Sequence, residues 1–361
     1  MSREKVYNFS AGPSMMPESV LLKAKSELED YSDCGMSIME MSHRGKVFQK
    51  VFVETKEKLR STLSIPDSHE ILFLQGGATL QFAAIPMNLM CNDAADYAVT
   101  GNFSSLAAKE AAKYGKVNIT CDSSDRGHSY IPAQSELKLS DGAKYFYYCA
   151  NNTIYGTEWQ YVPETESPLV CDMSSDILSK PIDVSKYGLI YAGAQKNMAP
   201  AGLTVVIVDK ALAGNEISIC PSVMSYKTMI EKDSMLNTPP CWCIYMLGLM
   251  LDWIEEQGGV SAMEELRKQR AKILYDYLDE SRLFKAHAEP GSRSYMNVTF
   301  RTGSEELDSE FTKGAAKRGM PNVKGHRLTK GMRASIYNAM PLEGVQALVS
   351  YMKEFEVNHN V

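Results

Sequence analysis

Hydrophobic residues recur along the chain in two rhythms that predict different elements. At 17–28 and 46–63 they fall at helical spacing, which predicts two amphipathic helices near the N-terminus. From about residue 70, short apolar runs of strand length alternate with helical patterns at 80–90 and 105–114. Strands that alternate with helices are typical of an α/β fold with a mostly parallel sheet covered on both faces. The predicted strands are 70–74, 96–100, 117–121, 144–149, 169–172 and the two runs on either side of residue 196.

The C-terminal third has a pattern of its own. Apolar residues predict a long packed helix over 239–256, which the pair Gly258-Gly259 ends. A chain of 361 residues also exceeds the length at which one hydrophobic core usually stops growing, so two domains are expected. We place their boundary near Gly258. Beyond it the pattern predicts a helix at 261–280, a strand at 295–300, a helix at 305–317, a strand near 333–337 and a final helix.

Composition and charge exclude several classes of function. The net charge of −6 argues against a nucleic-acid or anionic-membrane partner, because either would attract a basic face. No apolar run is long enough to span a bilayer, and no signal core follows the first residues, so a cytoplasmic protein is expected. The eight cysteines are then expected to be reduced thiols. Neither they nor the six histidines show metal-ligand spacing, so no metal site is expected.

Lys196 is the single charged residue between positions 187 and 208, where small residues and a proline join two strand-like runs. A lysine in such a crowded turn is expected to be partly desolvated, which favours the neutral amine over the ammonium ion. A neutral amine attacks carbonyl carbons, and formation of a Schiff base is its natural use. The same pattern also fits a lysine whose stem packs against the core while its head reaches water.

A Schiff-base lysine gains most from an electron sink, and pyridoxal 5'-phosphate is the commonest one. Its pyridine nitrogen must stay protonated, which requires a carboxylate held against it. Asp172 ends the apolar run 168–172 and precedes Lys196 by 24 positions, room for a turn and a strand. We therefore take Asp172 as the candidate partner of the pyridine nitrogen. An aspartate at a strand end also serves as a helix cap or turn former, and that alternative stays open.

Three further features fit the same cofactor. The run 76–79, Gly-Gly-Ala-Thr, follows a predicted strand and opens a helix, a geometry that offers backbone donors to a phosphate. Phe103, in the loop after the next strand, is placed to cover the pyridine ring, and Thr153 to hydrogen-bond its hydroxyl. Each has a plainer explanation, namely a turn for 76–79 and for Thr153 and a core position for Phe103.

Arginines indicate the class of substrate. Two His-Arg pairs, His43-Arg44 and His326-Arg327, lie in glycine-flanked loops, and Arg333 begins a predicted strand soon after the second. Because a guanidinium binds carboxylates and phosphates through two parallel hydrogen bonds, this set suggests a doubly anionic substrate. Surface arginines are common, so each one alone carries little weight.

Taken together, the chain resembles the phosphoserine aminotransferases, which are class V, fold-type I enzymes dependent on pyridoxal 5'-phosphate. The resemblance extends from about residue 6 to about residue 351. The motifs that carry it are NFSAGP at 8–13, SHR at 42–44, QFAAIP at 81–86, YAGAQKN at 191–197, NTPP at 237–240 and MRASIYNA at 332–339.

The resemblance implies an architecture and a reaction. The fold would comprise a large cofactor-binding domain with a mostly parallel central sheet (16–258), a smaller C-terminal α/β domain (259–361) and an N-terminal segment near the active site (1–15). The protein would be a homodimer with shared active sites. It would reversibly transaminate 3-phosphohydroxypyruvate with L-glutamate, giving O-phospho-L-serine and 2-oxoglutarate in serine biosynthesis. The phosphorylated substrate of pyridoxine biosynthesis, 4-phosphohydroxy-L-threonine, would be a second substrate.

The resemblance also implies a role for each candidate residue. Lys196 would form the Schiff base and move the α proton, while Asp172 would pair with the pyridine nitrogen. The cofactor would further be held by Phe103 against its ring, by Thr153, by Ala78, Thr79 and Gln195 at its phosphate, and by Asn237 and Thr238 of the other subunit. The substrate would be bound by Ser10, His43, Arg44, His326, Arg327 and Arg333, the last as a clamp on the α-carboxylate.

Two departures and two alternatives accompany this interpretation. Some bacterial members have an arginine at the position of Thr79, so we expect somewhat weaker binding of phosphorylated substrates, with the His-Arg pairs bearing more of it. Many members have tryptophan at Phe103, which keeps an aromatic face. A lyase of the cysteine-desulfurase type would need a reactive loop thiol, for which only Cys34 and Cys220 qualify. A non-catalytic scaffold should have lost Lys196 or Asp172.

Overall fold

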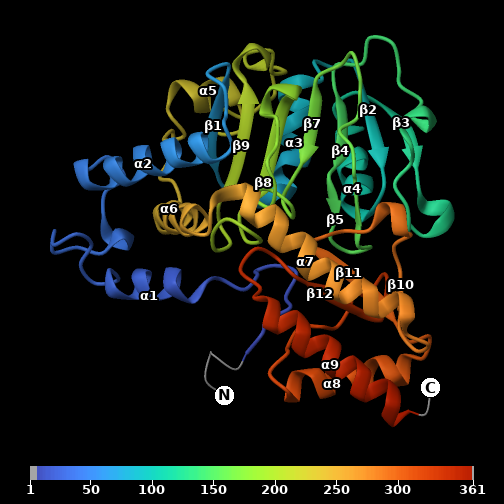
Figure 1. The fold of residues 1–361 in the computed structure, drawn as a ribbon. Helices are drawn as coiled ribbons and strands as arrows, with labels where there is room; N and C mark the ends of the chain where they lie inside the picture. The colour runs from blue at the N-terminus through green and yellow to red at the C-terminus, as the bar shows by residue number, and fades with distance from the viewer. Residues whose placement is uncertain (1–5, 360–361) are drawn as a thin grey trace.

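The computed structural model describes residues 6–359, and the predicted α/β architecture is confirmed (Figure 1). A seven-stranded sheet has the order β1-β9-β8-β7-β4-β2-β3, in which only β9 runs against the other strands. The sheet is therefore mostly parallel. Its strands are β1 (His69–Leu74), β2 (Ala94–Val99), β3 (Lys116–Asp122), β4 (Phe146–Cys149), β7 (Leu169–Asp172), β8 (Tyr187–Gly193) and β9 (Thr204–Asp209).

Helices cover both faces of this sheet because its strands alternate their apolar side chains. In β1, Ile71 and Phe73 join a core with residues of α1, α2 and α6, whereas Leu72 and Leu74 join one with residues of α3, α4 and α5. A strand buried on both faces is typical of parallel sheets. The helices are α1 (Glu18–Ser26), α2 (Lys46–Thr62), α3 (Gly77–Leu89), α4 (Asn102–Ala111), α5 (Tyr226–Glu231) and α6 (Cys241–Glu256).

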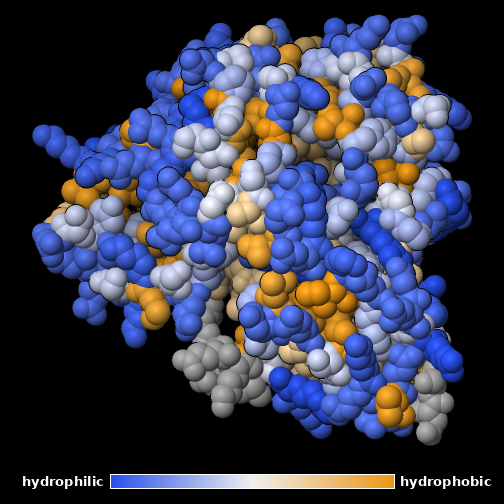
Figure 2. Space-filling view, in the orientation of Figure 1, coloured by the Kyte–Doolittle hydropathy of each residue, from blue (hydrophilic) through white to orange (hydrophobic). Residues whose placement is uncertain are grey.

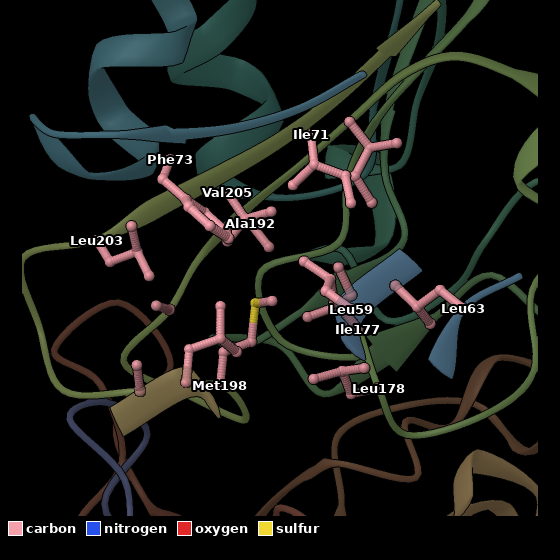
Figure 3. Close-up of a cluster of buried hydrophobic side chains, with 14 of the residues drawn as sticks. Leu59, Leu63, Ile71, Phe73, Ile177, Leu178, Ala192, Met198, Leu203 and Val205 are labelled. Carbon is pink, nitrogen blue, oxygen red and sulfur yellow. The ribbon is translucent and has the colours of Figure 1, made fainter. Parts of the chain in front are cut away.

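The turn between β8 and β9 is anchored in the larger of these cores. Figure 3 shows Ala192 and Met198, which flank Lys196 in the sequence, in the same cluster as Leu203, Val205 and Phe73. All five side chains are buried. Dense packing of this kind leaves few alternative conformations to the backbone between Ala192 and Leu203. The predicted pair of strands around Lys196 is thus confirmed as an antiparallel β8-β9 hairpin.

The C-terminal part forms a second, smaller sheet with its own core. After α6 the chain turns at Gly258, whose φ of 97° is left-handed, and the predicted boundary lies in this turn. Figure 1 shows the smaller sheet with α8 and α9 below the larger one, and α7 crossing between them. Phe9 is buried in the C-terminal core, so the N-terminal segment packs there too. The elements are α7 (Gly259–Glu280), β10 (Lys285–Ala286), β11 (Asn297–Arg301), α8 (Glu305–Lys317), β12 (Met332–Ser335) and α9 (Leu342–Asn358).

Several element boundaries differ from those expected. Helix α3 begins at Gly77, so both glycines of 76–79 contribute to its start, and α4 begins at Asn102, which places Phe103 in a helix and not in a loop. A short hairpin, β5 (Asn151–Asn152) and β6 (Thr157–Glu158), was not expected. The 3₁₀ helices are η2 (Ile38–Glu40), η3 (Ser124–Arg126), η4 (Gln134–Glu136), η5 (Val184–Lys186), η6 (Lys210–Leu212) and η7 (Pro290–Ser292).

The surface is mixed in character. Figure 2 shows hydrophilic side chains over most of the visible face, with smaller apolar groups between them. Among residues 6–359, no helix is long and apolar enough to cross a membrane.

Candidate active site

The predicted cofactor residues gather where the parallel strands end. Asp172 is the last residue of β7, and Lys196 follows β8 in the turn toward β9. Gly76 follows β1 and opens α3, while Phe103 lies in the first turn of α4, after β2. Because the carboxyl ends of parallel strands share one edge of the sheet, these residues meet at the edge that faces the C-terminal part (Figure 1).

Lys196 is half-buried, and its amine is held within the chain. Its Nζ donates a hydrogen bond to Thr153 Oγ1 at 2.9 Å and lies 5.8 Å from the centroid of the Phe103 ring. The N-terminal segment holds the backbone around Lys196. The amide of Ser14 donates to the Gln195 carbonyl at 2.9 Å, and the Ser14 hydroxyl donates to the carbonyl of Lys196. The amine therefore points into a site shared with Thr153 and Phe103, three residues predicted from separate stretches of the sequence.

Asp172 is buried, and each of its carboxylate oxygens accepts one hydrogen bond from the protein. Oδ1 accepts from the amide of Ser174 at 2.9 Å, and Oδ2 accepts from the hydroxyl of Tyr191 at 3.1 Å. An oxygen with one donor still has a lone pair for a further N–H. Asp172 also lies opposite Cys149 in the β4-β7 register, where burial and the Asp172 charge raise the pKa of the thiol and the Lys196 charge opposes them.

The start of α3 has the geometry of a phosphate cradle. Gly76 has a φ of 91°, and a Cβ there would come within 2.4 Å of Leu80, so the tight turn requires glycine. A Cβ at Gly77 would meet open space, which leaves the first amides of the helix accessible to an anion. Ala78 borders the lysine turn, because a Cβ on Gly193 would lie 3.5 Å from the Ala78 Cβ and 2.8 Å from Gln195 Oε1.

The other residues predicted for the phosphate lie beside this cradle. Thr79 is exposed in the first turn of α3. Asn237 and Thr238 are exposed as well, and the Thr238 carbonyl accepts from Gln75 Nε2 of its own chain at 2.6 Å. The structure thus brings 237–238 next to the turn that begins at Gln75, and whether they serve this cradle or that of a second subunit stays a prediction.

Arg333 is joined to the lysine through Thr153. Its Nη1 donates to the Thr153 carbonyl at 3.2 Å, and burial lowers the pKa of the guanidinium. A buried polar contact fixes this arrangement, since Asn297 on β11 accepts from Asn151 Nδ2 at 2.7 Å and donates to Ser335 Oγ at 2.9 Å. The β5-β6 hairpin with Thr153 and the β12 strand with Arg333 are therefore held together.

The two His-Arg pairs lie in different parts of the chain. His43-Arg44 precedes α2, at the left of Figure 1, whereas His326-Arg327 lies between α8 and β12 on the wall of a cavity of about 480 Å³. Within residues 6–359, no hydrogen bond or ion pair joins one pair to the other. Burial and the charges of Arg333 and Arg327 lower the pKa of His326. Both arginines of the pairs are exposed.

The N-terminal segment lies over the lysine turn. A Cβ on Gly12 would be 3.5 Å from the Cγ atoms of both Gln195 and Lys196, and the Ala11 carbonyl accepts from the Tyr337 hydroxyl at 2.8 Å. Ser10 is half-buried two residues earlier, and its Oγ accepts from the Gly12 amide at 3.5 Å. The segment is thus close to the site as expected, with no direct bond from Ser10 to Lys196 among the described residues.

Sequence reasoning missed several residues that support Asp172. Ser174 donates its amide to the carboxylate, and its Oγ accepts from the amide of Gly193 at 3.0 Å, which links the ends of β7 and β8. Tyr191 and, behind it, Tyr147 form a hydroxyl pair at 2.8 Å. The strand register identifies Tyr191, because Tyr191 on β8 pairs directly with Asp172 on β7. In the sequence alone, a tyrosine inside an apolar run looks like any core aromatic residue.

These residues fit pyridoxal 5'-phosphate. The donor set combines an amine, an aromatic face, a buried carboxylate with free lone pairs and a helix start open to an anion, which are the four contacts that this cofactor needs. Sulfur transfer is disfavoured at Cys220, one of its two candidate thiols. Burial and the nearby Glu216 raise the pKa of the Cys220 thiol, which disfavours the nucleophilic thiolate.

Comparisons with known proteins point to one family. The family model described as "Aminotransferase class-V" matches residues 6–348. A phosphoserine aminotransferase from Bacillus cereus is 51% identical over 99% of both chains. The solved phosphoserine aminotransferase from Bacillus circulans subsp. alkalophilus has a TM-score of 0.96 and 43% identity over 99% of both chains. A structure of the enzyme from Trichomonas vaginalis, described as bound to PLP, has a TM-score of 0.93 and 40% identity, covering 96% of this chain and 99% of its own.

Proposed function

The chain belongs to the class-V aminotransferases and, within them, to the phosphoserine aminotransferase family, and on that premise we propose a substrate pair and a role for each site residue. The protein is a transaminase that depends on pyridoxal 5'-phosphate. It transfers the amino group of L-glutamate to 3-phosphohydroxypyruvate, giving O-phospho-L-serine and 2-oxoglutarate. The second substrate expected from the resemblance, 4-phosphohydroxy-L-threonine, has the same charged groups and would bind in the same way.

The observation that carries this proposal is the placement of Lys196 and Asp172 at neighbouring strand ends of one sheet, each with its own hydrogen-bond partners. Pyridoxal 5'-phosphate, when bound, supplies the aldehyde that accepts an amino group and a ring that withdraws electrons from the substrate. Lys196 would hold the cofactor through its amine and would move the proton of the substrate α carbon. Asp172 would keep the ring nitrogen protonated and Phe103 would cover the ring face, while Thr153 orients the lysine amine.

The remaining site residues hold the phosphate group of the cofactor and bind the substrate. The amides of Ala78 and Thr79 at the start of α3, together with Gln195, hold the cofactor phosphate. Arg333 clamps the α-carboxylate of the substrate, since its guanidinium is fixed beside Thr153 and so beside Lys196. The second anionic group, a phosphate or the side-chain carboxylate of glutamate, is bound by Ser10, His43, Arg44, His326 and Arg327.

We also propose that the protein is a homodimer whose subunits complete each other's sites. Exposed apolar side chains of α1, η2 and α2, namely Leu22, Met39 and Val53, support a surface that a second copy would cover. His43-Arg44 directly precedes α2, so contact there would bring this pair toward the site of the partner. Asn237 and Thr238 would reach the partner's cofactor phosphate in the same assembly.

A reducing compartment such as the cytoplasm is the proposed location. All eight cysteines are free thiols in the structure. Proteins of oxidising compartments usually pair their cysteines, whereas cytosolic chains keep them reduced.

The proposed reaction is tested by its two halves. Cofactor-loaded protein is mixed with L-glutamate alone, and formation of one equivalent of 2-oxoglutarate per site is expected. Adding 3-phosphohydroxypyruvate should then release O-phospho-L-serine and restore the original absorption spectrum. Oxaloacetate and pyruvate are the matched controls, since they lack the phosphate. Equal turnover of pyruvate or oxaloacetate would refute the assignment of the substrate.

A further inference from the structure

A buried line of tyrosine hydroxyls ends on Asp172. The Tyr191 hydroxyl donates to Asp172 Oδ2 at 3.1 Å, and the Tyr147 hydroxyl lies 2.8 Å from that of Tyr191. Each hydroxyl has one proton to donate. Because Tyr191 uses its proton on the carboxylate, the proton between the two tyrosines must come from Tyr147. The direction of the line is therefore fixed, from Tyr147 through Tyr191 to Asp172.

Burial keeps both tyrosines in the form that donates. Tyr191 and Tyr147 are at most 1% exposed. Burial, followed by the Asp172 charge, raises the pKa of both phenols well above the ordinary value. Both phenols therefore remain protonated donors around neutral pH.

The carboxylate depends on this donor because no other side chain reaches Oδ2 in the described part of the chain. Its other oxygen accepts only the Ser174 amide, which belongs to the local turn. A buried carboxylate oxygen that loses its donor is costly, and the side chain is freer to rotate away from a ring N–H that it would face. Removing the Tyr191 hydroxyl should thus act on the cofactor through Asp172.

We propose that Tyr191, supported by Tyr147, is a positioning residue that orients the Asp172 carboxylate toward the cofactor's ring nitrogen. This inference rests on the proposed function, in which Asp172 has that partner. The β7-β8 register, which pairs Asp172 with Tyr191, makes the contact a product of strand pairing rather than of a mobile loop.

The same core contains a matched control. Tyr97 and Tyr145 form a second hydroxyl pair at 2.6 Å, and the Tyr97 ring stacks on Tyr147 with centroids 4.8 Å apart. Tyr145 is as buried as Tyr191, yet its hydroxyl has no bond to Asp172 among the described residues. Tyr145→Phe therefore removes one buried hydroxyl pair at a similar structural cost, without touching the carboxylate.

The test measures equilibrium binding of pyridoxal 5'-phosphate to apo-protein, together with steady-state kinetics. For Tyr191→Phe we expect the Kd of the cofactor to rise about tenfold, as for the loss of one hydrogen bond to a charged group. The kcat should fall about tenfold while KM for glutamate stays within about twofold. Tyr147→Phe should raise the Kd of the cofactor and lower kcat by about threefold each, since Tyr191 still donates to Asp172. Tyr145→Phe should lower the thermal midpoint and leave Kd and kcat unchanged.

A double-mutant comparison separates this inference from the proposed function. In the Asp172→Ala background, Tyr191→Phe should cause no further change in Kd, because the group it acts through is gone. If Asp172→Ala weakens binding but Tyr191→Phe behaves like Tyr145→Phe, the inference is overturned while the function stands. If Asp172→Ala itself leaves binding and kcat unchanged, the assignment of Asp172 fails and the inference fails with it. Should Tyr191→Phe not fold, the threefold shift in Tyr147→Phe against none in Tyr145→Phe decides the question.

Discussion

The two residues proposed to be central to cofactor binding, Asp172 and Lys196, lie at strand ends within one chain, whereas the His-Arg pairs proposed for the second anionic group lie in loops. Asp172 is 6% exposed with both oxygens hydrogen-bonded, and Lys196 has Thr153 as its partner. Arg44 and Arg327, by contrast, are exposed and lie in separate loops. In the proposed site, folding of one chain already fixes Asp172 and Lys196 through their hydrogen bonds. The proposed contacts to the second anionic group have no such fixed arrangement within one chain.

The largest expected effect comes from the buried side. Lys196→Ala removes the amine that attaches to the cofactor and moves the α proton, so turnover should fall by about four orders of magnitude. The absorption band of the lysine-bound cofactor should also disappear. Lys210→Ala, at an exposed lysine of η6, is the control and should keep both. Retained turnover in Lys196→Ala would contradict the assigned role.

Asp172→Ala should leave Lys196 able to bind the cofactor but weaken proton abstraction. Without the carboxylate the ring nitrogen loses its proton, so we expect kcat to fall by about two to three orders of magnitude with a smaller change in KM. Stopped-flow spectra with glutamate would measure the proton-transfer step directly. A variant with slow binding of glutamate but normal proton transfer would place Asp172 on the substrate side instead.

Exposed arginines should affect recognition and not the chemical step. Arg44→Gln and Arg327→Gln each remove one charged contact to the second anionic group, so the KM for O-phospho-L-serine should rise about tenfold to a hundredfold. The kcat should change little. L-serine, which lacks the phosphate, is the matched substrate and should be unaffected. Equal binding of serine and phosphoserine by the unaltered protein would refute the phosphate assignment for both arginines.

Much of this comparison could be predicted from the sequence. Lys196 and Asp172 stood out because each is a charged residue at the end of an apolar run, and strand ends collect ligands in parallel sheets. The mostly parallel sheet followed from the alternation of strand and helix patterns, and the resemblance to the family is confirmed by the match over residues 6–348. The roles of the individual site residues remain predictions.

The rest depended on distances that no local pattern encodes. Tyr191 and Tyr147 lie in apolar runs, where an aromatic residue normally fills the core, and only the register shows that one of them reaches Asp172. The expected loop around Phe103 proved to be the first turn of α4, where the Ser104 hydroxyl accepts from the amides of Thr100 and Gly101 just before the helix. Likewise, nothing in the sequence of the two His-Arg pairs indicated that they lie in separate parts of the folded chain.

Thr79 offers a smaller test that links the two sides. It is exposed in the first turn of α3, the proposed cofactor cradle. Thr79→Arg should lower the KM for phosphorylated substrates about threefold to tenfold, by adding one charged donor, and change the KM for glutamate less. Thr79→Gln, which adds length without charge, is the control. A weaker affinity for the cofactor with no gain for phosphosubstrates would show that Thr79 faces only the cofactor.

The smallest expected effect is on the stability of the protein near Thr153. Tyr155, two residues after Thr153, lies between His128 and His287, with ring centroids 4.7 Å and 6.0 Å away. Burial lowers the pKa of both histidines, although Asp122 and Asp125 partly offset this at His128. The folded protein therefore keeps them neutral where the unfolded chain already binds protons.

The free energy of unfolding should consequently fall as the pH drops through the ordinary histidine range. Above that range the contribution of the two neutral histidines is fully present. Urea unfolding between pH 8 and pH 5 should show a larger loss for the unaltered protein than for His287→Gln, which cannot take up that proton. Identical pH profiles would mean that His287 does not contribute. The kcat at pH 8 should be the same in both proteins.

The most direct test of the central claim asks where the cofactor is attached. Holoenzyme is reduced with borohydride, digested and sequenced by mass spectrometry. We expect one phosphopyridoxyl group per chain, on the peptide that contains Lys196, and none on that peptide after prior treatment with excess glutamate. Attachment to any other lysine, or no attachment in a protein that still transaminates, would contradict this expectation.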